Sequence, residues 1–279
     1  MLRIVLFLIA GFVAVVWWQR KRFAAMVAQE ADDLIHTAQA YSPGRYDPAQ
    51  IADLPDPVQR YFKRNLTPGQ PLYRFVRFRQ QGTLSTSPNA KAMPFDAVEY
   101  LSAQPPAFLW QVRLKMPANL WIDGRDKYQA GHGAMLIKPL SAVAVVDAHD
   151  ADIAEASALR WLAEAFTLPT ALLPSAKISW SAAEEPNQAR IGLHDAHIDI
   201  QGTVTFNDAG DIVAFRAMRV KDSGQPPMLW GGDVSGHQQF NNMWIPTQVS
   251  VKWFLPEGDY TYFDATWTDY EFDVFERYG

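Results

Sequence analysis

Residues 150–166 read DADIAEASALRWLAEAF and are followed by TLPTALLP at 167–174. This is the one strongly helical segment inside a long series of strand-like segments. Asp152 followed by Glu155 suits a capped helix start with acidic residues near the positive helix end, and Pro169 and Pro174 set its limit. The apolar residues recur at i, i+3, i+4 and i+7, which predicts one buried helix face: Leu159, Leu162, Ala163 and Phe166. A helix of this kind, set between strands, is expected to cover the face of a sheet.

The chain on both sides of this helix alternates between apolar and polar residues, the pattern of half-buried strands. The clearest alternation runs from Phe108 to Lys115. Short strand–turn–strand spacing predicts antiparallel pairing. Turn-forming residues predict hairpins at 123–124, 207–211 and 256–259, and strands are expected at 244–254, 260–267 and 270–275. We therefore predict an α+β fold: an N-terminal transmembrane helix, then a strongly curved antiparallel β-sheet, half-barrel-like, with a central helix packed on its concave face.

The N-terminus carries an uncharged, almost wholly apolar run at residues 4–18, close to the length that spans a bilayer. Trp17 and Trp18 end this run, and Arg20, Lys21 and Arg22 follow it. Aromatic and basic residues are typical of a membrane interface. A cleaved signal peptide is the alternative, but it would have small residues where the two tryptophans stand. The pattern favours an uncleaved anchor.

We expect residues 4–18 to bind the lipid bilayer, with the protein in the inner (cytoplasmic) membrane as a single-pass protein. Three basic residues follow the apolar run and one precedes it, which leans towards a cytoplasmic main domain. A half-barrel would suit the other side, so the side of the main domain stays open. The expected organisation is 1–22 membrane anchor, 23–53 juxtamembrane helix and linker, and 54–279 a single α+β domain.

Composition excludes several classes of function. Of the 279 residues, 48% are hydrophobic and 20% charged, which supports a real core. The net charge of −5 argues against a nucleic-acid partner, and the absence of Cys excludes disulfides and thiolate metal sites. The densest sets of possible metal ligands fit neither calcium nor zinc motifs, so no metal or cofactor is expected: Asp147, His149, Asp150 and Asp152, and His194 with His197.

Several motifs resemble an uncharacterised bacterial family of domains of unknown function. They are LPxPVxRYF at 54–62, Gly131-x-Gly133, RWLAEA at 160–165 followed by PTALLP at 169–174, and Val251-x-Trp253. The resemblance runs from about residue 54 to the end and implies no established activity. More loosely, a curved antiparallel sheet crossed by a helix is similar to the half-barrel of the LolA/LppX lipoprotein-carrier group, a likeness of architecture that does not give a function.

The sequence favours binding over catalysis. Our first hypothesis is a membrane-anchored protein that binds a lipid, a lipidated partner or another hydrophobic ligand in a cavity of the curved sheet. The expected ligand-binding residues are aromatic: Trp161, Phe166, Phe108, Trp110 and Trp180. One alternative is a hydrolase-type enzyme using Glu164 with a cleft histidine, and another is a non-catalytic scaffold. Glu164 is open to two interpretations, an inward-facing carboxylate or a surface ion pair with Arg160 four residues earlier.

Overall fold

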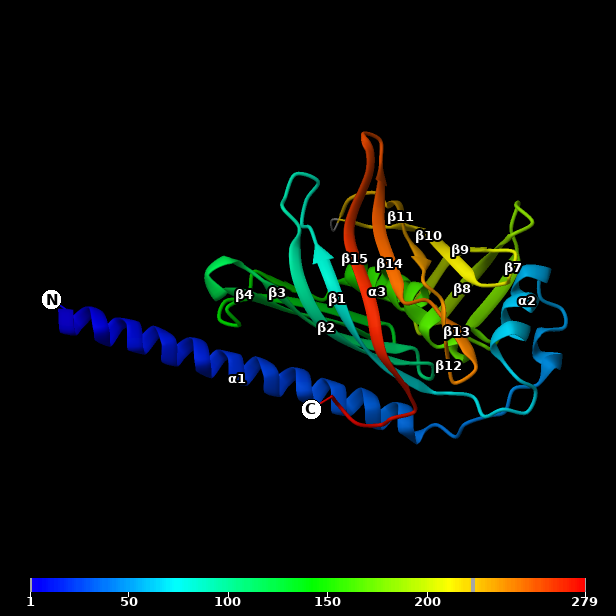
Figure 1. Cartoon of the computed structure of the whole chain (residues 1–279), viewed down its shortest axis with the longest axis horizontal. Helices are drawn as coiled ribbons and strands as arrows, with labels where there is room; N and C mark the ends of the chain where they lie inside the picture. Colours follow the sequence, from blue (N-terminus) through cyan, green and yellow to red (C-terminus); the bar gives the residue numbers. More distant parts are fainter. Residues whose placement is uncertain (1, 222–223, 279) are drawn as a thin grey trace.

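The fold is a single large antiparallel sheet curved around one helix. The structure is a computed structural model that describes residues 2–221 and 224–278 (Figure 1). In this part of the chain, thirteen strands form one sheet in the order β6-β5-β4-β3-β2-β1-β15-β14-β11-β10-β9-β8-β7. The helix α3 (Ala151–Glu164) lies inside the curve. The predicted fold class is confirmed.

The sheet consists of two meanders. The first contains β1 (Phe75–Leu84), β2 (Met93–Ser102), β3 (Ala107–Lys115), β4 (Trp121–Gln129), β5 (His132–Pro139) and β6 (Val146–Ala148). The second contains β7 (Ile178–Ala182), β8 (Gln188–Asp195), β9 (Ile198–Phe206), β10 (Ile212–Arg219), β11 (Met228–Ser235), β14 (Gln248–Leu255) and β15 (Gly258–Phe272). The first and last strands, β1 and β15, pair from Val76 with Phe272 to Leu84 with Phe263 and join the two meanders.

This topology explains why α3 lies on the concave face. The strands before and after it, β6 and β7, are at opposite edges of the sheet, so the connecting chain must cross a face. The helix begins with a cap in which Asp150 Oδ1 accepts a hydrogen bond from the Ile153 amide at 2.9 Å. It ends at Glu164, ahead of Pro169, and continues as two short 3-10 helices, η3 (Ala165–Thr167) and η4 (Pro169–Leu172).

A glycine allows α3 to approach the sheet closely. A Cβ atom on Gly133 of β5 would lie 2.6 Å from the Ile153 carbonyl oxygen and 2.8 Å from Ala154 Cα, both in the first turn of α3. Such distances are well inside van der Waals contact, so only glycine fits at this crossing. The second glycine of the Gly131-x-Gly133 motif is thereby explained by packing.

Three details of the predicted strands are wrong. β4 runs straight through Asp123-Gly124, where we expected a turn, because Gly124 pairs with Val112 on one side and Ile137 on the other. The two strands expected after residue 260 are the single strand β15. The strand expected at 244–254 is two, β13 (Met243–Ile245), paired with β12 (Gln238–Phe240), and β14. The hairpin turn at 207–211 is confirmed, with Gly210 at a φ of 89°.

A single helix, α1 (Leu2–Ala40), includes both the apolar run and the segment expected as a separate juxtamembrane helix. Over an 18-residue window its mean hydropathy is 1.6, with none of the window buried, and by length and composition it is suited to cross a membrane. Its C-terminal half packs instead on the convex face of the sheet, against Phe75, Tyr100 and Leu109, through one apolar stripe: Phe23, Val27, Ala31, Leu34, Ile35 and Ala38.

Two further helices cover one end of the curved sheet. The 3-10 helix η1 (Pro48–Ile51) precedes α2 (Asp56–Asn65), whose apolar face packs inward. The Phe62 ring lies 6.4 Å from the Trp180 ring, and Asn65 Oδ1 accepts a hydrogen bond from the Trp244 amide at 2.7 Å. At the other end, β3 and β4 are joined by η2 (Pro117–Asn119). A cavity between α3 and the sheet is lined by Leu114 and Ile122, which pair close to that end.

Candidate functional site

The interior contains a cavity of about 340 Å³ between α3 and the concave face of the sheet. Its walls come from both meanders, with β3, β4 and β5 on one side and β10, β11, β14 and β15 on the other. The lining is mainly apolar and aromatic and includes Leu114, Ile122, Phe215, Val251 and Phe263. A volume of this size falls at the lower end of the range for small-molecule pockets, roughly 300–1,000 Å³.

Two of the five aromatic residues expected to bind ligand line this cavity, namely Trp110 and Phe166. The other three do not. Trp161 is fully buried on the far side of α3, where its indole Nε1 donates to the Ser102 carbonyl oxygen at 3.0 Å. Trp180 donates to the Leu172 carbonyl oxygen at 2.8 Å and packs under α2. Phe108 is buried beneath the guanidinium of Arg160.

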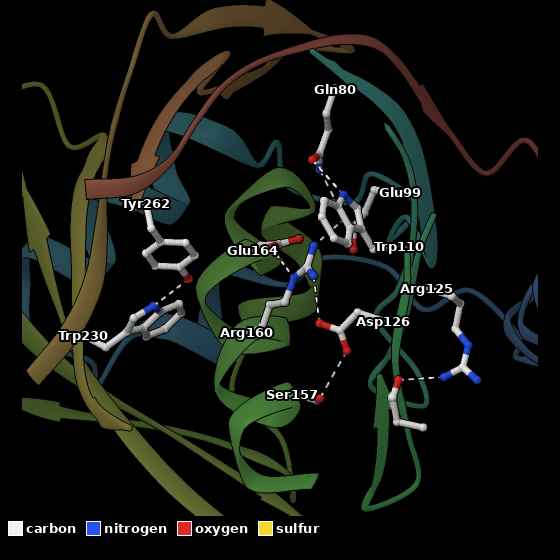
Figure 2. A network of polar contacts seen from close by, with 11 residues as sticks. Gln80, Glu99, Trp110, Arg125, Asp126, Ser157, Arg160, Glu164, Trp230 and Tyr262 are labelled. Carbon is white, nitrogen blue, oxygen red and sulfur yellow. Dashed lines mark hydrogen bonds and ion pairs between the residues drawn. The ribbon is translucent and has the colours of Figure 1, made fainter. Parts of the chain in front are cut away.

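The polar centre of the cavity is Arg160, which points from α3 towards the sheet (Figure 2). Its three nitrogens contact three different carboxylates: Nε lies 2.7 Å from Glu164 Oε1, Nη1 lies 2.8 Å from Asp126 Oδ2, and Nη2 lies 3.1 Å from Glu99 Oε2. The guanidinium also stacks over Trp110, 4.5 Å from the ring centroid. One cation therefore ties α3 to β2 and β4 across the cavity wall.

Further hydrogen bonds hold this cluster in place. Gln80 Nε2 donates to Glu99 Oε2 at 3.2 Å, and its Oε1 accepts from Trp110 Nε1 at 3.0 Å. Ser157, one turn before Arg160, donates to Asp126 Oδ1 at 3.4 Å. Each partner fixes the rotamer of the next, so the positions of the charges are set by the sheet and the helix together.

The charges of the cluster are unbalanced, with three carboxyl groups around one guanidinium. Glu99 is completely buried, and this desolvation, followed by the Glu164 charge, raises the pKa of Glu99 well above its usual value. Burial alone would lower the pKa of Arg160, but the carboxylates of Glu164, Glu99 and Asp126 raise it. Within the described chain, Glu99 Oε1 and Glu164 Oε2 are both buried without a hydrogen-bond partner. A proton on Glu99 supplies a donor and removes one excess negative charge.

Glu164 combines the two interpretations offered by the sequence. It forms the predicted pair with Arg160, and it also faces the cavity, with its side chain 17% exposed. No histidine is among the described residues that line the cavity, so the enzyme alternative finds no cleft histidine beside Glu164.

Sequence reasoning missed Glu99 and Asp126. The alternation of β2 carried a signal for Glu99, because its neighbours on the same face, Ala97 and Leu101, are buried and apolar.

The opposite wall of the cavity carries a second cation. Arg219, at the end of β10, stacks over Trp230 at 4.5 Å and lies 5.9 Å from the Trp253 ring centroid. Trp230 Nε1 in turn donates to Tyr262 Oη at 3.0 Å, as Figure 2 shows. Among the residues that the structure describes, Arg219 Nε is buried without a hydrogen-bond partner. Arg160 is thus matched by carboxylates, whereas the contacts of the Arg219 guanidinium within residues 2–221 and 224–278 are with aromatic rings.

The acidic and histidine-containing segments noted in the sequence are separate from this cavity. In residues 2–221 and 224–278, no three His, Asp or Glu side chains come together as a metal site would require. His194 faces Asp199 across the β8–β9 pair. Asp150 forms the helix cap described above.

Comparison with solved structures gives distant likenesses. A LolA superfamily protein from Nitrosomonas europaea is 9% identical, with a TM-score of 0.37, covering 77% of this chain and 91% of that one. A domain named for an outer membrane lipoprotein-sorting protein from Vibrio parahaemolyticus is 9% identical, with a TM-score of 0.39, covering 78% and 92%. At such low scores these likenesses carry no inference about architecture, ligand or activity.

Comparison by sequence is more specific. A search of curated proteins gave no match. A family model matches residues 44–265, which covers the first strand, α3 and most of the last strand. The expectation of an uncharacterised family is therefore confirmed: the chain belongs to the Family of unknown function (DUF6544).

Proposed function

We propose that this protein is a membrane-anchored binding protein that holds a lipid, an acyl chain or another hydrophobic ligand in the cavity between α3 and the sheet. The observation that carries the proposal is the apolar cavity of about 340 Å³ inside the curve. Burial of apolar ligand surface contributes roughly 25 cal/mol per Å² before the costs of association, so an apolar lining favours such a ligand. A scaffold protein would be expected to fill this space with its own side chains.

The polar groups at the cavity suit positioning better than covalent chemistry. Arg160 is engaged with Glu99, Asp126 and Glu164 and holds the helix on the sheet. Arg219 has no ion-pair partner among the described residues and is accessible to a ligand. A guanidinium stacked on tryptophan prefers an acidic head group. We therefore assign Trp110 and Phe166 to the apolar part of the ligand and Arg219 to its polar head.

The proposed location is supported by α1. Its apolar run at residues 4–18 is proposed to anchor the protein in the inner membrane, with the remainder of α1 packed on the convex face of the sheet. A binding cavity held next to a bilayer has a continuous supply of hydrophobic ligands. Anchor and cavity therefore support the same function.

The test is mass spectrometry of lipids that co-purify with the full-length protein extracted in detergent. Ala163 lines the cavity from α3, so Ala163→Phe should fill part of the space and reduce the retained lipid at least severalfold. The matched control is Ala182→Phe at an exposed position of β7, which should retain lipid like the wild type. Equal lipid content in the wild type and Ala163→Phe, or none in the wild type, would contradict the proposal.

A further inference from the structure

We propose that the end of the sheet formed by Leu120, Val143 and Val145 rests in the head-group region of the same bilayer that α1 crosses. This apolar rim would place the cavity directly beside the lipids of that membrane. The inference rests on the anchoring part of the proposed function and adds an interaction surface that the cavity alone does not imply.

The three rim residues are exposed and lie on adjoining connections. Leu120, Val143 and Val145 are 46%, 66% and 61% exposed. They belong to two adjacent connections, β3–β4 and β5–β6, which are joined through Trp121. The Trp121 carbonyl oxygen accepts a hydrogen bond from the Leu140 amide at 2.9 Å, and its Nε1 lies 3.2 Å from Ser141 Oγ. Single exposed apolar residues are ordinary, but three on adjoining loops form a surface.

Contacts between α1 and β4 fix the position of this rim along the axis of α1. The guanidinium of Arg20 lies 5.5 Å from the Trp121 ring centroid. Ten residues further along α1, Glu30 bridges Arg125 at 3.0 Å and Lys127 at 2.7 Å. Ten helical residues rise about 15 Å, and the six residues from 121 to 127 extend about 20 Å along a strand. Helix and strand thus run in the same direction over a similar length.

It follows that the start of β4 points towards the membrane-spanning part of α1. Figure 1 agrees, since the β3–β4 connection lies beside the middle of α1, whereas β7 and α2 lie at the far end of the molecule. Arg20 is the second residue after Trp18, which closes the apolar run. The tip at Leu120 is therefore level with the last residues of the span.

The chemistry at this level is that of a membrane interface. Trp17 and Trp18 are 60% and 52% exposed, and Lys21 and Arg22 stack over them at 5.4 Å and 5.6 Å. Tryptophan rings with neighbouring cations are enriched where acyl chains meet phosphate groups. Trp121 adds a third ring at the same level. A lipid surface is the partner that accepts exposed valine, leucine, tryptophan and basic residues together.

The rim also leads into the cavity. Ile122 directly follows Trp121, and Ile137 pairs with Val146 next to Val145. Both isoleucines line the cavity wall. An apolar ligand that leaves the bilayer at the rim therefore meets apolar side chains on its way inward.

The chain contains no cysteine, which permits a direct test with single-cysteine variants carrying a nitroxide label. Leu120→Cys, Val143→Cys and Val145→Cys are made in the full-length protein and reconstituted into phosphatidylcholine–phosphatidylglycerol liposomes. Accessibility to oxygen and to a water-soluble nickel complex gives the depth of each label. All three labels should lie at head-group depth.

Two further labels separate the possible failures. Val13→Cys, in the apolar run, should lie deep in the bilayer, and Glu185→Cys, in the exposed turn between β7 and β8 at the far end, should lie in water. A deep label at 13 with aqueous labels at 120, 143 and 145 would overturn the docking while leaving the anchor and cavity intact. An aqueous label at 13 would overturn anchor and docking together. Rim labels shielded from both reagents would indicate a second protein copy on the rim and would also overturn the proposal. Lipid retention, measured separately, tests the cavity.

Discussion

Arg160 on α3 and Glu99 on β2 are in direct contact, with Nη2 and Oε2 3.1 Å apart, although Glu99 is completely buried. A polar group removed from water is tolerated only when it is hydrogen-bonded or paired. Here the pair joins the helix to the sheet at the wall of the cavity.

Replacing Arg160 with methionine should destabilise the protein by about 3 kcal/mol or more. The substitution leaves the carboxyl groups of Glu99 and Asp126 buried without their cation, and breaking a buried pair in this way typically costs about 3–5 kcal/mol. The measurement is urea unfolding of the full-length protein in detergent micelles, followed by tryptophan fluorescence. Arg190→Met, at an exposed position of β8, is the control and should change stability by less than about 0.5 kcal/mol. Equally small changes in the free energy of unfolding for both variants would show that the Arg160 cluster contributes little to stability.

Replacing Glu99 with glutamine should change how stability depends on pH. Burial and the nearby Glu164 charge raise the pKa of Glu99 in the folded protein. Above about pH 4.3, the ordinary value for glutamate, the folded state therefore binds this proton more than the unfolded state does. The free energy of unfolding then decreases as pH rises towards the folded pKa.

Glutamine keeps an acceptor oxygen for Arg160 but cannot ionise. The stability of Glu99→Gln relative to the wild type should therefore increase as pH rises from about 4.3 towards the folded pKa of Glu99, as measured by urea unfolding at several pH values. Glu155→Gln, at an exposed position of α3, serves as the control. Its free energy of unfolding should change with pH in parallel with that of the wild type. A parallel curve for Glu99→Gln as well would mean that Glu99 ionises normally.

Replacing Gly133 with alanine should loosen α3 from β5. The new Cβ would lie 2.6 Å from the Ile153 carbonyl oxygen, so the helix or the strand must shift. Overpacking of this kind typically destabilises by about 1–3 kcal/mol. Gly44→Ala is a matched control, because its Cβ would meet only the Leu72 Cδ1 methyl group at 3.3 Å. The measurement is thermal unfolding of both full-length variants, and the midpoint of Gly133→Ala should lie below that of Gly44→Ala. Equal midpoints would contradict the close packing of α3 on β5.

Replacing Arg219 with glutamine should weaken binding of acidic amphiphiles by about tenfold, equivalent to about 1.4 kcal/mol. The reason is loss of the one cavity cation, among the described residues, that lacks a carboxylate partner. Photo-cross-linking in liposomes with a photoreactive fatty acid, and with the fatty alcohol of equal length, measures the effect of the head group. The alcohol should cross-link equally to the wild type and to Arg219→Gln.

Arg216→Gln is the control for this prediction. Its guanidinium is bound to Asp233 and to the Gly232 carbonyl oxygen, and the side chain does not line the cavity. Cross-linking of the fatty acid should be unchanged in this variant. Equal loss of acid and alcohol in Arg219→Gln would indicate a change in cavity shape and contradict a head-group contact.

Local patterns predicted the elements more accurately than their limits. Alternation identified β3 and helical spacing identified α3, because each pattern is set by the neighbouring residues alone. The Asp123-Gly124 turn failed for a tertiary reason. Asp123 accepts hydrogen bonds from Arg113 and Trp121, and Gly124 lets Val112 pack closely, so both residues serve a continuous strand. Turn chemistry is a local preference that such contacts override.

The sequence by itself determined the apolar N-terminal run, the antiparallel strands, the central helix and the Arg160–Glu164 spacing, because these depend on residues near one another in the chain. Only the tertiary structure decided that Glu99 and Asp126 join this pair, since they come from strands 61 and 34 residues away from Arg160. It likewise moved Trp161 from the expected ligand set into the core and placed Arg20 against Trp121. Which face of α3 meets which strand depends on the crossing from one edge of the sheet to the other, a property of the whole fold.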